Sequence, residues 1–108
     1  MNQGDVYWYT FRHPDKRRPV LILTRNSAIP YLTGITVATI TSNIRGNRSE
    51  VILTPEQDGV LVESAVTFDN IQTVQKSNLN SYLTSLSPER MRQVRQAIEF
   101  AFDFVAMA

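Results

Sequence analysis

The chain of 108 residues has no cysteine and only one histidine, His13. The lack of thiols excludes disulfide bonds, thiolate metal sites and a cysteine nucleophile, and one imidazole cannot form a histidine cluster for zinc. The sequence also lacks an apolar run near the ~20 residues that cross a bilayer, and it begins without the basic-then-apolar pattern of a secretory signal. We therefore expect a protein that uses no metal or cofactor, does not enter a membrane and works in the reducing cytoplasm.

Several catalytic motifs are missing as well. The sequence has no glycine-rich phosphate loop, no G-x-S-x-G nucleophile elbow, no H-E-x-x-H motif and no carboxylate cluster that suggests Mg²⁺. What is present is a composition of 43% hydrophobic and 19% charged residues, which is typical of a folded protein rather than a disordered one. At this length, residues 1–108 are predicted to form a single domain with one modest core.

The charged residues are unevenly distributed along the chain. Residues 1–49 hold seven of the eleven Lys and Arg and two of the ten Asp and Glu, which gives a net charge of +5. Residues 50–108 have a net charge of −4. A basic half in a near-neutral chain favours a local anion-binding surface rather than a uniformly cationic protein.

The run VLIL at residues 20–23 predicts a central strand that is covered on both faces. It is short, rich in branched side chains and bounded by Pro19 and Asn26. Arg17 and Arg18 stand at its entrance. A guanidinium at the end of a buried strand is well placed to bind a phosphate, although two solvated charges beside a strand would give the same sequence.

Further short strands are predicted from β-branched and alternating residues. They cover residues 5–11, 36–41, 49–54, 65–68 and 71–74. In the first, residues 6, 8 and 10 share one face and the aromatic residues 7, 9 and 11 the other, so that exposed rings could stack on bases or pack in a core and a dimer surface. In the second, residues 37, 39 and 41 form a face rich in hydroxyls. Such strands predict a small, strongly curved barrel or half-barrel.

The last part of the sequence changes to a helical period. Ser87 is a candidate N-cap, and Pro88 suits the first helical position. Apolar residues then recur at spacings of three and four, which predicts an amphipathic helix that closes over the sheet. This apolar stripe comprises Met91, Val94, Ile98, Ala101 and Val105. A second apolar face, with residues 97, 100 and 104, favours deeper burial or a partner surface.

The remaining polar side chains suit one kind of chemistry. Arginine, threonine, asparagine and one histidine favour a reaction that needs charge stabilisation more than a strong nucleophile. RNA has its own nucleophile, the 2′-OH, so a protein that aligns this hydroxyl with the phosphorus can cleave RNA without a metal. His13 lies in the charged segment 12–17 between the first two strands, and it is either a general acid or base or an ordinary polar surface residue.

The order of the motifs resembles that of the MazF/PemK (Kid) toxins of type II toxin–antitoxin systems. The resemblance spans nearly the whole chain, and it rests on several motifs in the same order rather than on any one of them. The motifs are GDV at residues 4–6, RPVL at 18–21, TITSNIRG at 39–46, DG at 58–59, DNIQTV at 69–74 and LSPE at 86–89.

The resemblance implies a mainly β protein with a C-terminal helix (α+β), a small SH3-like or CcdB-like curved barrel closed by an amphipathic helix. It also implies a homodimeric, metal-independent, sequence-specific endoribonuclease. Such a toxin cleaves single-stranded RNA and leaves 2′,3′-cyclic phosphate and 5′-OH ends. A cognate antitoxin protein is the expected inhibitor.

By this resemblance, the family's Arg-Pro arginine falls on Arg18 and its catalytic Thr/Ser on Thr41. We expect Arg18 to stabilise the scissile phosphate and Thr41 to donate a hydrogen bond to a non-bridging oxygen. Because an arginine stays protonated at neutral pH and is a poor general base, His13 or a bound water is expected to share the proton transfer. The residues expected to contact RNA are Arg17, Ser42, Asn43, Arg45, Asp69 and Gln72.

The sequence departs from the family pattern at two places. The segment between the first two strands is short and lacks the usual Gly, Glu and Gln residues before Arg-Pro, and Gln72 stands where an arginine is common. A gyrase-binding toxin of the CcdB type is an alternative on the same barrel, but the sequence ends VAMA instead of Trp-Gly-Ile. A passive nucleic-acid-binding barrel is a third interpretation, which predicts salt-dependent binding without cleavage.

Overall fold

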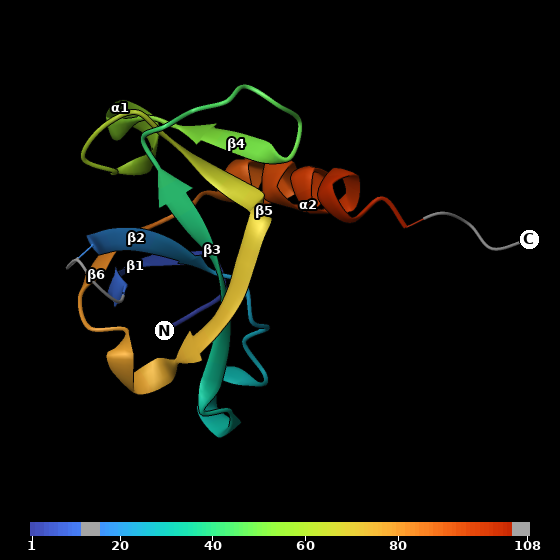
Figure 1. Ribbon diagram of the computed structural model, residues 1–108. Coiled ribbons are helices and arrows are strands. Elements are labelled where there is room, and N and C mark those ends of the chain that lie inside the picture. The colour runs from blue at the N-terminus through green and yellow to red at the C-terminus, as the bar shows by residue number, and fades with distance from the viewer. Residues whose placement is uncertain (12–15, 105–108) are drawn as a thin grey trace, which may run out of the picture.

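The computed structural model describes residues 1–11 and 16–104, and its main feature is a curved antiparallel sheet of six strands closed by a helix (Figure 1). The strand order is β4-β5-β3-β2-β1-β6. The strands are β1 (Asp5–Phe11), β2 (Lys16–Ile22), β3 (Gly34–Thr41), β4 (Glu50–Leu53), β5 (Ser64–Gln75) and β6 (Tyr82–Ser85). The helices are η1 (Ile29–Tyr31), α1 (Pro55–Asp58), η2 (Lys76–Asn78) and α2 (Pro88–Phe102). The predicted fold class, a mainly β half-barrel with a C-terminal helix, is confirmed.

The central strand β2 is buried on both faces, as its sequence predicts. Leu21 belongs to a core cluster between the sheet and α2, whereas Val20 and Ile22 belong to a second cluster on the other face. All three side chains are fully buried. Tyr7, Tyr9 and Phe11 of β1 are half-buried and pack against the second cluster. The prediction that these rings pack in a core is therefore confirmed, whereas base stacking and a dimer surface stay predictions.

Two strand predictions are wrong in detail. The predicted breaks at Asp69 and Asn70 do not end a strand, because β5 continues as one strand from Ser64 to Gln75. Its pairing with β3 instead jumps from Ala38–Ile71 to Thr39–Thr67. Residues 68–70 therefore bulge out of the ladder, and the strand bends there without breaking.

Strand β6 has no counterpart in the prediction. It pairs only with β1, across Asp5–Ser85, and its residues are exposed or half-buried. An edge strand without a buried face lacks the alternation of apolar and polar residues that identifies a strand in sequence.

Helix α2 closes the first core cluster, packing on β4 and β5. Its N-terminus is capped as predicted, because the Ser87 hydroxyl accepts the Arg90 backbone N–H at 3.1 Å. Ala97 is buried with Val94, so it belongs to the core side and not to a separate apolar face. Phe100 remains 44% exposed. Among the described helices, none has the length and hydropathy to cross a membrane.

Helices α1 and α2 are joined by an internal ion pair. The predicted turn at residues 55–59 is a single helical turn, and Asp58 at its end has a side chain only 1% exposed. Arg90 donates to both Asp58 carboxylate oxygens, at 2.9 and 3.1 Å. Asp58 also accepts the Thr54 backbone N–H at 2.8 Å. These bonds hold α1 against α2.

Candidate active site

Strands β2 and β3 separate at one end, and Arg18 and Thr41 lie at this opening. The two strands pair from Ile22–Val37 to Val20–Thr39. Continuing this register by two residues would place Arg18 opposite Thr41, but pairing stops before Pro19, which has no N–H to donate to a ladder. Beyond this point β2 stays with β1 and β3 stays with β5. The separation leaves Arg18 and Thr41 at matching positions on either side of a gap.

A pocket of about 480 Å³ occupies one face of this gap. It continues the face of the sheet that holds Val20 and Val37. Residues two apart in a strand share a face, so Arg18 lies on the same face as Val20, and Thr41 on the same face as Val37. The sheet thus changes along one face from a buried apolar cluster to a polar pocket. The pocket is lined by Phe11, Arg18, Thr39, Thr41, Asn43, Arg45, Asn47, Glu50, Thr67, Asp69, Asn70 and Gln72.

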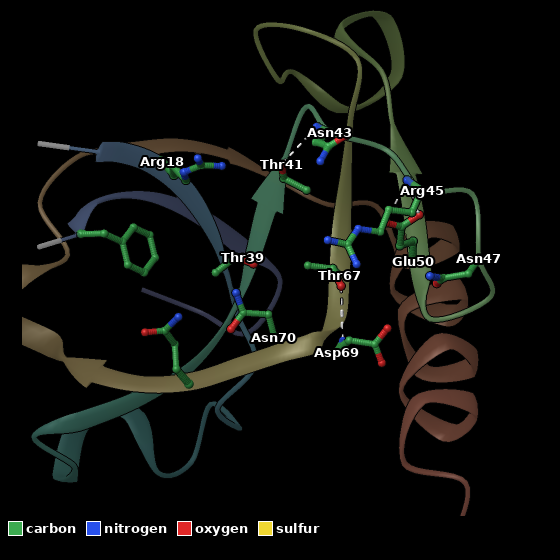
Figure 2. Close-up of a pocket in the computed structure, with 12 residues that line it drawn as sticks. Arg18, Thr39, Thr41, Asn43, Arg45, Asn47, Glu50, Thr67, Asp69 and Asn70 are labelled. Carbon is green, nitrogen blue, oxygen red and sulfur yellow. Dashed lines mark hydrogen bonds between the residues drawn. The ribbon is translucent and has the colours of Figure 1, made fainter. Parts of the chain in front are cut away.

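The Thr41 hydroxyl is already held in place by the backbone. Its oxygen accepts the Asn43 N–H at 3.0 Å (Figure 2). Since a hydroxyl has one proton to donate, an accepted bond leaves that proton available for a ligand. In the same view Arg18 extends from β2 toward the end of β3, where Thr41 lies. A phosphate between them could accept from both groups.

The segment 42–49 brings Arg45 over the pocket, and Glu50 holds this segment in place. Both Glu50 oxygens accept the Arg45 backbone N–H at 3.3 Å, and one accepts the Gly46 N–H at 2.8 Å. Gly46 has a φ of 80°, which favours glycine at this turn. On its outer side the segment is held by Arg48, whose guanidinium lies 4.7 Å from the centre of the Phe100 ring. The Arg45 guanidinium extends from this anchored backbone into the pocket.

The bulge of β5 supplies the opposite wall of the pocket. The ladder partner of Thr39 is Thr67, and both residues line the pocket. The Thr67 hydroxyl accepts the Asp69 N–H at 3.3 Å. Ser49, which is buried, donates its hydroxyl proton to the Asp69 carboxylate. The bulge therefore directs Asp69 and Asn70 to the pocket rather than leaving them in a regular ladder.

The pocket collects most of the predicted site residues, but not all of them. Arg17 and Ser42 line a second pocket on the other face of the sheet, because each follows or precedes a lining residue by one position in an extended chain. His13 lies outside the described residues. The predicted residues that line the first pocket are Arg18, Thr41, Asn43, Arg45, Asp69 and Gln72.

Five further polar residues were not predicted for this site: Thr39, Asn47, Glu50, Thr67 and Asn70. The hydroxyl-rich face of residues 37–41 was a signal for Thr39. Thr67 and Asn70 reach the site through the β3–β5 register and its bulge, which no local pattern reveals. Glu50 is an acidic residue in a site expected to bind an anion, and nothing in the sequence around it indicated that it lies there.

The pocket contains charged residues of both signs, but its arginines form no ion pair with the described carboxylates. Arg18 and Arg45 line it together with Glu50 and Asp69. Within residues 1–11 and 16–104, the ion pairs formed by arginines are those of Arg90, Arg92 and Arg95. Neither arginine of the pocket is paired with a carboxylate there. Their charge is therefore free to bind an anion such as a phosphodiester.

Comparison with known proteins identifies close relatives of the chain. Residues 2–102 match the family described as PemK-like, MazF-like toxin of type II toxin–antitoxin system. The chain is 40% identical over 101 residues to the probable endoribonuclease MazF5 of Mycobacterium tuberculosis, covering 94% of this chain and 92% of that protein. It is 40% identical over 89 residues to endoribonuclease MazF3 of the same organism, covering 82% and 85%.

A solved structure has the same fold. The toxin MazF-mt6 of Mycobacterium tuberculosis superposes with a TM-score of 0.84 at 35% sequence identity, covering 94% of this chain and 99% of that one.

Proposed function

The chain belongs to the PemK-like, MazF-like toxin family of type II toxin–antitoxin systems, and we propose that it is a sequence-specific, metal-independent endoribonuclease that cleaves single-stranded RNA. The names of the relatives support this activity: MazF3 is named an endoribonuclease and MazF5 a probable endoribonuclease. The observation that carries the proposal is the position of Arg18 and Thr41 on the two sides of one pocket.

The reaction is an attack of the RNA's own 2′-oxygen on the adjacent phosphorus. The bond from the 2′-oxygen to phosphorus forms as the bond to the 5′-oxygen breaks, which gives a 2′,3′-cyclic phosphate and a 5′-OH. Negative charge grows on the non-bridging oxygens in the transition state. Arg18 and the free proton of Thr41 are the groups that stabilise this charge, and Arg45 adds a second cation to the same pocket.

Proton transfer completes the step. The 2′-hydroxyl must lose a proton, and the 5′-oxygen must gain one. We assign these transfers to His13 or a bound water, since the guanidinium of Arg18 stays protonated at neutral pH. The positive charge of two arginines supplies the electrostatic stabilisation that a metal ion supplies in other nucleases.

The RNA chain is bound by the polar lining of the pocket. Asn43, Arg45, Asp69 and Gln72 are the proposed RNA contacts in the first pocket, with Arg17 and Ser42 next to it. The family's description as the toxin of a toxin–antitoxin system supports an inhibitory cognate antitoxin. We also propose that residues 1–108 form a single toxin domain, which acts as a homodimer in the cytoplasm.

The test is incubation of the purified protein with long RNA in EDTA. We expect discrete fragments whose 5′ ends accept phosphate from polynucleotide kinase without prior phosphatase treatment, and whose 3′ ends carry a cyclic phosphate. Sequencing of these ends gives the cleavage motif. Intact RNA in every buffer, or inhibition of gyrase supercoiling without RNA fragments, would contradict the proposal and favour the CcdB-type alternative.

A further inference from the structure

A second pocket of about 520 Å³ lies on the opposite face of the same gap between β2 and β3. It differs from the first pocket because its walls are mostly apolar. Leu61 and Val62 on its rim are 68% and 56% exposed. The lining residues are Trp8, Arg17, Arg18, Pro19, Ile40, Ser42, Val60, Leu61, Val62, Ser64 and Leu83.

The two pockets share one residue, Arg18. This sharing follows from the separation of β2 and β3, because where the strands no longer pair a side chain in the gap can reach both faces of the sheet. A polymer whose phosphate is bound by Arg18 can therefore place one neighbouring unit in each pocket. The volume of the second pocket is within the range of small-ligand sites, about 300–1,000 Å³.

Arg17 forms a flat platform in the second pocket. Its guanidinium carbon lies over the Trp8 ring, 4.2 Å from the ring centre, which is a cation–π contact. Arg17 is exposed, so the face of the guanidinium turned away from Trp8 is open. Unstacked RNA bases stack on aromatic rings and on arginine planes alike. Trp8 and Arg17 together thus present the surface that a nucleobase would cover.

We propose that the second pocket binds the base of a nucleotide next to the scissile phosphate, stacked on the Arg17 guanidinium. This inference rests on the proposed ribonuclease function and adds a specificity subsite to it. The RNA would cross the sheet at Arg18, with one flanking nucleotide in the polar pocket and the other in the apolar one. It also gives a role in RNA binding to Arg17 and Ser42, which lie outside the first pocket.

The positive charge of the second pocket favours a negatively charged ligand such as RNA. Its lining contains two arginines and no carboxylate. A polyanion is therefore attracted more strongly to this pocket than to the first one, where carboxylates offset part of the positive charge. Ser42 offers a hydroxyl to a base edge. Continuity with the first pocket through Arg18 then selects the occupant, namely the next nucleotide of the same strand.

The experiment uses the single tryptophan of the chain, Trp8, as a reporter inside the second pocket. The probes are short RNAs that contain the mapped cleavage site with a 2′-deoxy substitution at the scissile nucleotide, which prevents cleavage. Two matched probes have an abasic nucleotide immediately 5′ or immediately 3′ of the scissile phosphate. We expect the intact probe to change Trp8 emission. One of the two abasic probes should leave the emission unchanged and bind on the order of tenfold more weakly.

Variants of Arg17 connect this loss to the platform. Arg17→Ala should weaken binding of the intact probe by a similar factor, with no further loss on the critical abasic probe. Arg17→Lys keeps the charge but not the flat group, so it should behave like Arg17→Ala in this comparison. Arg95→Ala, which removes an arginine side chain that is 82% exposed on α2, is the control and should leave the difference between the probes intact.

Three results would overturn the subsite. The first is unchanged Trp8 emission at a saturating concentration of the intact probe. The second is that the losses of affinity caused by Arg17→Ala and by the abasic probe multiply. The third is a change of oligomeric state in Arg17→Ala, which would make the pocket an interface between copies. Each of these leaves cleavage of long RNA by the unmodified protein in place. Absence of that cleavage would instead overturn the proposed function and the subsite with it.

Discussion

The arginines of this small protein differ in whether their charge is paired within the protein. Arg90 is surrounded by acceptors: it donates to Asp58 at 2.9 and 3.1 Å, to Gln93 at 3.0 Å and to Gln57. Arg18 and Arg45 line an open pocket without an ion pair among the described residues. The first arrangement uses its charge to hold α1 against α2. Arg18 and Arg45 instead leave their charge unpaired where an anion can reach it. This difference separates an arginine that binds a ligand from one that stabilises the fold.

Removal of Arg18 from the pocket is expected to have the largest effect. Arg18→Ala should lower the cleavage rate of a matched RNA by about a thousandfold, because the growing charge on the phosphate loses one of the two arginines that line the pocket. The free energy of unfolding should change by less than about 0.5 kcal/mol, since a half-buried side chain at an open strand end has little packing to lose. Single-turnover cleavage and urea denaturation measure the two quantities. A rate near that of the unmodified protein would remove Arg18 from the site.

The structural arginine should give the reverse result. Arg90→Ala should lower the free energy of unfolding by about 3 kcal/mol, because it leaves the buried Asp58 carboxylate without its partner. Arg92→Ala is the matched control. Its ion pair with Glu89 is 62% and 66% exposed, and it should contribute less than about 1 kcal/mol. Equal losses in the two variants, measured by urea denaturation, would contradict the structural role of Arg90.

A smaller effect is expected at Glu50, which holds the segment that presents Arg45. Glu50→Ala removes the acceptor for the Arg45 and Gly46 N–H groups, and it should reduce kcat/KM on the order of tenfold through misplacement of Arg45. Glu50→Gln keeps one acceptor oxygen and removes a negative charge that faces the RNA, so it should retain kcat with an unchanged or lower KM. Steady-state kinetics on a short matched RNA separate the two variants. If they are equally impaired, the carboxylate charge matters rather than the segment it holds.

The parts of the fold that the sequence predicted are those with a local signal. Residues 20–22 of the apolar run are buried on the two faces of β2, although the strand ends before Leu23, and Ser87 caps α2 as its position before Pro88 indicates. Strand β6 was missed because it lies at a sheet edge with no buried face. The division of β5 into two strands was wrong because a bulge and a chain break look alike in sequence: both interrupt the alternation with polar residues such as Asp69 and Asn70.

The site was predictable only in part for a similar reason. Arg18 and Thr41 could be named from the motifs around them, but their position at one gap depends on the register between β2 and β3. That register connects residues that are far apart in the chain. The division of consecutive residues between two pockets also required the structure: Thr41 lines the first pocket, Arg17 and Ser42 line the second, and Arg18 lines both. The roles assigned to all of these residues remain predictions for experiment.

The most direct test of the account is a double-mutant cycle between Arg18 and Thr41 on one matched RNA. Single-turnover cleavage rates are measured for the unmodified protein, Arg18→Ala, Thr41→Val and the double variant. If both groups stabilise the same phosphate, their effects are coupled, and the double variant should be at least about fivefold faster than the product of the single losses predicts. Losses that multiply within error would mean that the two side chains act independently, and would contradict their convergence on a single phosphodiester.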